Sequence, residues 1–335
     1  MSRPPVTPAA PALDEAVEAG QRRLSPEMVP VVGVLVCTGL LMIAIWIVSP
    51  ESALLAQVEG ILVSAIFLAV AAFGQGLTIL LGGIDLSIGV VMGLGGMMIS
   101  GLTNGSNDAL VWAVPATLVC CAGIGLVNGV GVALGSIPPF IMTLASATSF
   151  FGVGLGLTAG AAQAPVAPAL EALMSGRWLG VPWAILLLLA FAVVAIAFQN
   201  NSVVGRKLYA VGSSPGASRV LGLPVGALTI AVYATSALCA GTAGLLLAGY
   251  SSAATLNMGD PFLLPSIAAV VIGGARVTGG RGIYLGTFAG ALFLSTLETI
   301  ITVLSLSQGL RDLIQGAIIV TALIAQRSRS DANSG

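Results

Sequence analysis

Two acidic side chains stand inside long apolar stretches and are the first candidates for chemistry. Asp85 follows Gly82 and Gly83 and precedes an apolar run that begins at Leu86, and Glu298 lies within another such run. A charged side chain at the centre of a bilayer costs about 2.5–3.5 kcal/mol on insertion scales, so each needs a reason to be there. Asp85 is placed either to cap the helix that follows it or to act in gating or in contact with a partner. Glu298 either faces a polar cavity or is neutralised by a partner.

Residues for other kinds of chemistry are missing. The chain has no histidine, which excludes imidazole acid–base catalysis and histidine metal sites. Its one lysine, Lys207, is followed by leucine, so the sequence holds no P-loop of the Gly-Lys-Ser/Thr type. The four cysteines form no Cys-x-x-Cys pair and are predicted to be small buried hydrophobic residues. We therefore expect no enzyme active site, no metal and no cofactor on this chain.

The composition indicates a membrane protein. Of 335 residues, 57% are hydrophobic and 7% are charged, with a mean hydropathy of +1.04, whereas soluble domains are about 25% charged. No charged residue stands between Asp108 and Glu171, a distance well beyond the roughly 18 apolar residues that indicate a membrane span. The net charge of −1 and the lack of a basic stripe exclude nucleic-acid binding.

Ten apolar segments predict an all-α polytopic fold of about ten transmembrane helices. They cover residues 30–48, 58–81, 86–102, 109–134, 138–158, 182–199, 226–249, 262–275, 283–304 and 311–326. The eighth segment is too short for a full span of about 20 residues. A half-helix or re-entrant piece is the alternative for it, because protein can cover such a piece inside the membrane.

The basic residues predict the orientation of these segments. Cytosolic regions attract lysine and arginine, and with an even number of spans and both termini in the cytosol ten basic residues lie inside and two outside. The inner set is Arg3, Arg22, Arg23, Arg206, Lys207, Arg219, Arg276, Arg281, Arg327 and Arg329, and the outer set is Arg177 and Arg311. Residues 1–25 and 327–335 are then cytosolic tails, the first of them disordered, and residues 26–326 form the membrane domain.

The loop 200–224 is the most informative cytosolic feature. Ser214 followed by Pro215 is a helix start, because proline is favoured at the first helical position, and Gly222 ends the helix. A short capped helix between two spans is what a partner needs in order to push on a membrane domain. The alternative is a basic loop that only fixes the topology.

Four sequence blocks in order resemble ribose-type sugar ABC transporter permeases over about residues 60–325. One block is the loop signature, which is formed by Gly205, Arg206, Tyr209, Ala210, Gly212, Ala217, Arg219 and Gly222. The others are Gly82-Gly83-Ile84-Asp85-Leu86-Ser87-Ile88-Gly89, Gly125-Leu126-Val127-Asn128-Gly129 with Ile137-Pro138-Pro139-Phe140, and Ala268-Ala269-Val270-Val271-Ile272-Gly273-Gly274 with Gly279-Gly280-Arg281-Gly282.

This resemblance implies a type II-like permease subunit of an ABC importer in the bacterial inner membrane. Two copies, as a homodimer or a heterodimer, would form one pathway for a pentose, hexose or related polyol. A separate cytosolic ATPase would bind ATP-Mg, and a periplasmic binding protein would deliver the sugar. The loop signature residues would couple to the ATPase. The candidate residues for the translocation path or gate are Asp85, Ser87, Asn128, Pro138, Pro139, Thr143 and Glu298.

Two departures from the family pattern leave alternatives open. Ser213 to Gly216 stand where asparagine or an acidic residue is common, and Glu298 stands where asparagine or a small residue is usual. One alternative is a permease for branched-chain amino acids, whose related family lacks the block at residues 82–89. The other is an ion-coupled secondary transporter in which Asp85 and Glu298 relay protons or bind sodium.

Overall fold

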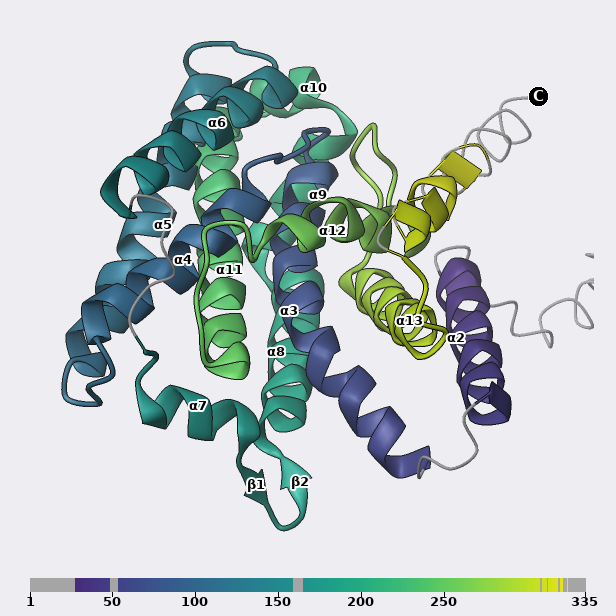
Figure 1. The fold of residues 1–335 in the computed structure, drawn as a ribbon. Helices are drawn as coiled ribbons and strands as arrows, with labels where there is room; N and C mark the ends of the chain where they lie inside the picture. Colours follow the sequence, from purple (N-terminus) through teal and green to yellow (C-terminus); the bar gives the residue numbers. More distant parts are fainter. Residues whose placement is uncertain are drawn as a thin grey trace, which may run out of the picture.

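The computed structural model describes residues 28–48, 54–158 and 165–307 and most of 309–324, and almost all of them lie in helices (Figure 1). The longer helices are α2 (Met28–Val48), α3 (Leu54–Leu80), α4 (Ile88–Thr103), α5 (Leu110–Ala133), α6 (Pro139–Thr158), α8 (Trp183–Asn201), α11 (Val225–Ser251), α12 (Asp260–Ile272) and α13 (Tyr284–Val303). The short elements are α7 (Pro168–Ser175), the strands β1 (Arg177–Trp178) and β2 (Val181–Pro182), α9 (Val203–Ser213) and α10 (Pro215–Val220). The two predicted tails lie outside the described residues.

The all-α membrane fold predicted from the sequence is confirmed. Within the described residues, seven helices are long and apolar enough to cross a membrane, namely α2, α3, α5, α6, α8, α11 and α13. Two further apolar helices, α4 and α12, have 16 and 13 residues. Each of the first nine predicted segments coincides with one of these helices, but the number of complete spans stays a prediction.

Helix α11 lies at the centre of the bundle and packs on α3, α4 and α5. Glycines allow this close approach: a Cβ atom on Gly244 would overlap the backbone of Met92, and one on Gly125 would overlap the backbone of Tyr233. Small residues serve this purpose in membranes, where lipid is as apolar as the helices and close packing must hold them together. The glycine-rich middle of the sequence is therefore the helix-packing core.

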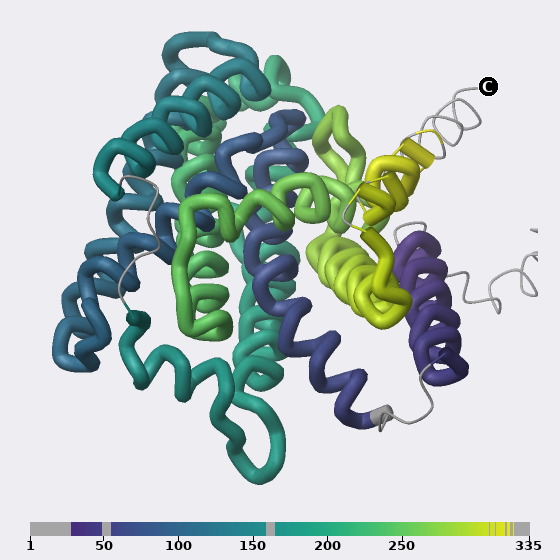
Figure 2. Tube along the Cα trace, viewed as in Figure 1, coloured from purple at the N-terminus to yellow at the C-terminus, as the bar shows by residue number. Residues whose placement is uncertain are grey.

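The eighth apolar segment begins inside the bundle. After α11 the chain returns as a non-helical stretch toward the interior before α12 starts, as Figure 2 shows. This stretch lies against α4, because Leu256 touches the backbone at Gly93, and Gly259 touches Gly89. Irregular backbone at membrane depth is tolerated where protein covers it, and the 13 residues of α12 agree with the predicted half-helix.

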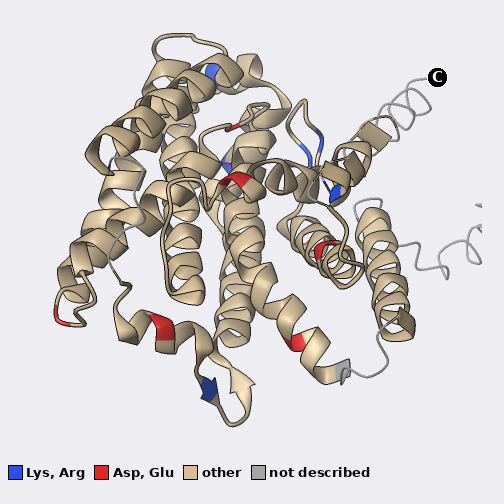
Figure 3. Cartoon of the chain, in the orientation of Figure 1, with Lys and Arg blue, Asp and Glu red and all other residues tan. Residues whose placement is uncertain are grey.

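The two ends of the bundle differ in charge. Helix α7 and the β1–β2 hairpin lie at one end, the hairpin end, and α9 and α10 lie at the opposite end, the coupling end (Figure 1). Figure 3 shows most lysines and arginines toward the coupling end and several acidic residues at the hairpin end. An ion pair between Arg177 of β1 and Glu59 near the start of α3, at 2.6 Å, ties the hairpin to the bundle.

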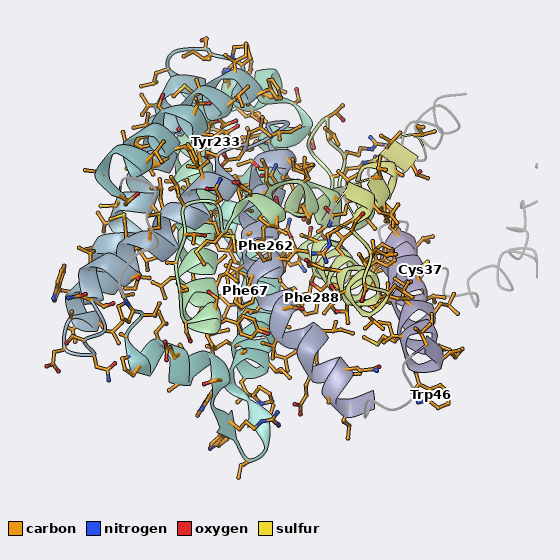
Figure 4. All side chains as sticks on the ribbon, viewed as in Figure 1. Cys37, Trp46, Phe67, Tyr233, Phe262 and Phe288 are labelled. Atoms are coloured by element: carbon orange, nitrogen blue, oxygen red, sulfur yellow. The ribbon has the colours of Figure 1, made fainter. Side chains whose placement is uncertain are left out.

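All four tryptophans of the chain are exposed at the hairpin end. Trp46 lies near the end of α2 (Figure 4), Trp112 near the start of α5, and the rings of Trp178 and Trp183 stack with centroids 5.9 Å apart. Tryptophan is enriched where a membrane meets water, because its ring is apolar and its N–H is polar. These positions predict that one boundary of the membrane lies at the hairpin end.

Candidate functional site

Asp85 is the centre of a buried polar cluster in the turn between α3 and α4. Its Oδ1 atom accepts hydrogen bonds from the Ser87 amide at 2.9 Å and the Ser87 hydroxyl at 2.6 Å, and its Oδ2 atom accepts one from Ser236 of α11 at 2.8 Å. The Asn128 amide of α5 donates to Ser87 Oγ at 3.0 Å. Thr143 of α6 accepts from the Leu86 amide at 3.0 Å. The turn between α3 and α4 is therefore bonded to three further helices, α5, α6 and α11.

The predicted capping role of Asp85 is wrong in its detail. Helix α4 begins at Ile88, and Ser87 occupies the capping position without a side-chain cap bond. The carboxylate instead holds the turn and joins it to α11. Asp85 is fully buried, and this burial raises the pKa of its carboxyl group. The hydroxyl group of Tyr233, also buried, has no hydrogen-bond partner among the described residues.

Three of the sequence blocks meet at the coupling end, where a Cβ atom on Gly279 would lie 2.9 Å from the Gly82 amide nitrogen. The Tyr209 hydroxyl of α9 donates to the Gly282 carbonyl at 2.7 Å, and Gln199 at the end of α8 donates to the same carbonyl at 3.2 Å. The Gly280 amide donates to the Leu80 carbonyl at the end of α3, at 2.9 Å. The loop 273–283 is thus bound to α3, α8 and α9. Glycine is required at Gly212, where a Cβ atom would overlap the Leu80 carbonyl.

The predicted short helix after Ser214 is confirmed as α10. The Ser214 hydroxyl accepts from the Ala217 amide at 3.3 Å, Pro215 is the first helical residue, and Gly222 follows the helix with φ of +77°. The helix is exposed on its outer side. Val220, the last residue of α10, is 89% exposed, and Leu221, directly after it, is 78% exposed. A loop that only fixes the topology through its basic residues would not need exposed apolar side chains here.

The coupling residues predicted from the sequence divide into two groups. Gly205, Tyr209 and Gly212 belong to α9 and are packed or bonded to neighbouring backbone. Ala217 and Arg219 are exposed on α10. Arg206 and Ala210 of α9 and Gly222 after α10 are exposed as well. The exposed residues present a surface to a partner, and the packed residues fix the base from which α10 projects. Sequence reasoning missed Val220 and Leu221, although two apolar residues in a polar loop were a signal for them.

A cavity lies between α10 and the Asp85 turn. Its walls come from the α5–α6 turn with Pro138 and Pro139, from α10 with Pro215 and Arg219, and from α11 with Tyr233. Gly83 and Tyr233 form its inner side, next to Asp85. Of the predicted path residues, the two prolines line this cavity, whereas Asp85, Ser87, Asn128 and Thr143 are buried in the polar cluster.

Glu298 lies apart from that cluster, in α13. Its Oε1 atom accepts from Arg311 at 2.9 Å, and the side chain is 45% exposed. It also lines a second cavity, between α3, α11, α12 and α13. Of the two alternatives stated for Glu298, the ion pair with Arg311 supports a partner, and the cavity that the residue faces is mostly apolar rather than polar. Two of the four cysteines, Cys37 and Cys120, are exposed, which corrects the prediction that all four are buried.

Known proteins similar to this chain are permeases. Residues 57–323 match the family model described as "Branched-chain amino acid transport system / permease component". The ribose import permease protein RbsC of Escherichia coli (strain K12) is 33% identical over 268 residues, which are 78% of this chain and 82% of that protein. The RbsC protein of Bacillus subtilis (strain 168) is 31% identical over 262 residues, which are 77% of this chain and 81% of the RbsC protein. The chain belongs to the family of ribose-type ABC importer permeases.

A more distant relative of the permease is the autoinducer 2 import system permease protein LsrD of Photorhabdus laumondii. It is 27% identical over 256 residues, 75% of the permease and 77% of LsrD. No solved structure matches the chain. The membrane helices and the family together make this chain a multi-pass transport subunit, and the resemblance stated from the four sequence blocks is confirmed.

Proposed function

We propose that this permease carries a pentose, a hexose or a related polyol across the bacterial inner membrane as part of an ABC importer. The observation that carries the proposal is the meeting of three family sequence blocks under an exposed helix, α10, in a chain that aligns with ribose permeases over about four fifths of their length. The family model is named for branched-chain amino acids, but relatives named for ribose and autoinducer 2 favour the sugar.

Helix α10 is the contact for a separate ATPase, which binds ATP-Mg. Its exposed face combines the small Ala217 with the apolar Val220 and Leu221, and a buried apolar side chain contributes about 1.5–3 kcal/mol to such a contact. Arg219 lies at the rim. Force on α10 passes to α9 and then to the loop 273–283 through Tyr209 and Gly282. Both termini lie on the ATPase side in this arrangement, and a periplasmic binding protein delivers sugar at the hairpin end.

A second copy of the permease completes the pathway, in a type II-like arrangement. Helix α6 supports this part of the proposal, because among the described helices it packs mainly on α4 and α5 and leaves much of its length exposed. The exposed face carries Thr148, Ser149 and Gly152. Small and hydroxyl residues of this kind are typical of helix–helix interfaces in membranes. Two identical copies make the simplest assembly, because in a symmetric dimer both copies use the same surface patch.

The secondary-transporter alternative requires carboxylates that exchange ions. Asp85 is fully buried and is bonded by three donors, and Glu298 is paired with Arg311. These contacts favour an anchoring role for Asp85 over an ion-exchanging one. The same cluster also places Ser87, Asn128 and Thr143 where they fix the turn beside the cavity formed by Pro138, Pro139 and Tyr233.

The test is to purify the permease with its ATPase and to measure ATP hydrolysis stimulated by the sugar-loaded binding protein. Ala217→Trp should uncouple the ATPase, because overpacking a fitted contact costs about 1–3 kcal/mol and lowers affinity about 5- to 150-fold. Gly216→Ala, beside it on α10, is the control, since a Cβ atom there meets open space. Full stimulation of the Ala217→Trp protein would refute α10 as the contact.

A further inference from the structure

The second cavity, which we name the aromatic cavity, has a volume of about 170 Å3. Helix α3 contributes Ser64 and Phe67, α11 contributes Tyr250, and α12 contributes Phe262. Glu298 and Ser295 of α13 complete the wall, together with Gln315. Small-molecule sites are mostly apolar with a few polar groups that fix orientation. This cavity has that composition.

One wall of the aromatic cavity is a set of three rings. The Phe67 ring lies 5.4 Å from the Tyr250 ring and 6.3 Å from the Phe262 ring, between centroids. Figure 4 shows Phe67 and Phe262 together near the middle of the bundle. Tyr250 is exposed, so its ring and hydroxyl are accessible from the cavity. An aromatic ring with a polar tip suits a ligand that has an apolar face and a hydroxylated edge.

The cavity also carries hydrogen-bonding groups, and among the described residues that line it the one charged residue, Glu298, is paired. Arg311 binds Glu298 through Oε1 at 2.9 Å and donates to Thr302 at 3.1 Å. The carboxylate is thereby neutralised, while a carboxylate has two oxygens and can accept further bonds at Oε2. Ser295 and Gln315 add a hydroxyl and an amide. A neutral ligand meets donors and acceptors here without displacing an ion pair.

We infer that the aromatic cavity binds a neutral polyhydroxylated solute during its passage through the permease. The inference rests on the proposed function and deepens it, because it assigns a place and a chemistry to the sugar inside the subunit. The cavity also adjoins α12, whose following loop is bonded to α9.

The experiment attaches a bulky group inside the cavity. Cys37 and Cys120 are first replaced by alanine, because they are exposed. Ser64→Cys then places a thiol in the cavity wall, and the matched control is Gly60→Cys, one turn earlier on α3, where a Cβ atom meets open space. The purified permease is labelled with N-ethylmaleimide, freed of reagent, and assembled with its ATPase and binding protein in liposomes. Labelling is verified by mass spectrometry.

We expect labelled Ser64→Cys to lose at least about 90% of ATP-driven ribose uptake and labelled Gly60→Cys to keep it. ATP hydrolysis stimulated by the loaded binding protein should persist in both, because the ATPase contact is remote. As a second measurement, Glu298→Leu should lower uptake at least about tenfold through the lost hydrogen bond. Retained uptake after labelling at Ser64, or equal loss at Gly60, would overturn the inference.

The unlabelled parent separates this inference from the proposed function. If the parent takes up no sugar, the proposed substrate is wrong and the sugar assignment of the cavity is overturned with it. If the parent takes up sugar and labelled Ser64→Cys still does so, the proposed function stands and only the cavity assignment is overturned.

Discussion

Replacing Asp85 tests whether the buried polar cluster is an anchor. Asp85→Ala removes an acceptor that serves the Ser87 amide, the Ser87 hydroxyl and the Ser236 hydroxyl. A buried donor left without a partner costs about 1–3 kcal/mol. Three such donors lower the free energy of unfolding by at least about 3 kcal/mol. The unfolding entropy is about 2.1 cal/mol/K per residue, which is about 0.7 kcal/mol/K for 335 residues. We therefore expect Tm to fall by at least about 4 °C.

Asp85→Asn is the matched variant. Its amide oxygen can accept the bonds from Ser87, and the Ser236 hydroxyl can turn to accept from the amide nitrogen, because a hydroxyl both donates and accepts. We expect a loss within about 1 kcal/mol. Ser236→Ala removes one bond to the carboxylate, which is worth about 1.5–3 kcal/mol, and should fall between the two.

The assay heats each purified variant in detergent and measures the fraction that remains monodisperse by size-exclusion chromatography. The expected order of stability is parent, Asp85→Asn, Ser236→Ala and Asp85→Ala. An Asp85→Ala protein as heat-resistant as the parent would refute the anchoring role. An Asp85→Asn protein as unstable or inactive as Asp85→Ala would show that the charge itself is needed, which would favour the ion-coupled alternative.

Three further predictions concern packing, the membrane boundary and the loop 273–283. Gly244→Val should reduce the yield of folded permease, because the valine side chain overlaps the backbone of Met92. The control is Gly226→Val, where a Cβ atom meets open space. Equal yields of the two variants would contradict this prediction. Fluorescence of Trp178 in a variant without the other tryptophans should be quenched by lipids brominated near the headgroup; quenching only by aqueous iodide would place the hairpin in water. Tyr209→Phe removes the hydrogen bond to Gly282 and should lower ATP-driven uptake, while the ATPase still copurifies with the permease. Undiminished uptake would show that this bond does not couple ATP hydrolysis to transport.

The sequence was sufficient for the membrane class, for nine apolar helices and for α10, whereas α7, α9 and the β1–β2 hairpin were not predicted. Apolar runs and a Ser-Pro start are local signals, and local signals predict local structure. The meeting of Tyr209 with Gly282, and of Asp85 with Ser236, could not be predicted, because the partners are far apart in sequence and no periodicity links them. Glu298 shows the same limit: its partner Arg311 lies beyond the end of α13, although each residue taken singly looked unusual.

The central claim is that this chain forms the sugar pathway of an ATP-driven importer. The most direct measurement is accumulation of labelled ribose, with xylose and glucose as alternatives, in liposomes that contain the permease, its ATPase and its binding protein. The account predicts uptake that requires ATP and all three proteins and that persists when proton and sodium gradients are collapsed. Uptake by the permease alone, driven by an ion gradient and indifferent to ATP, would contradict it.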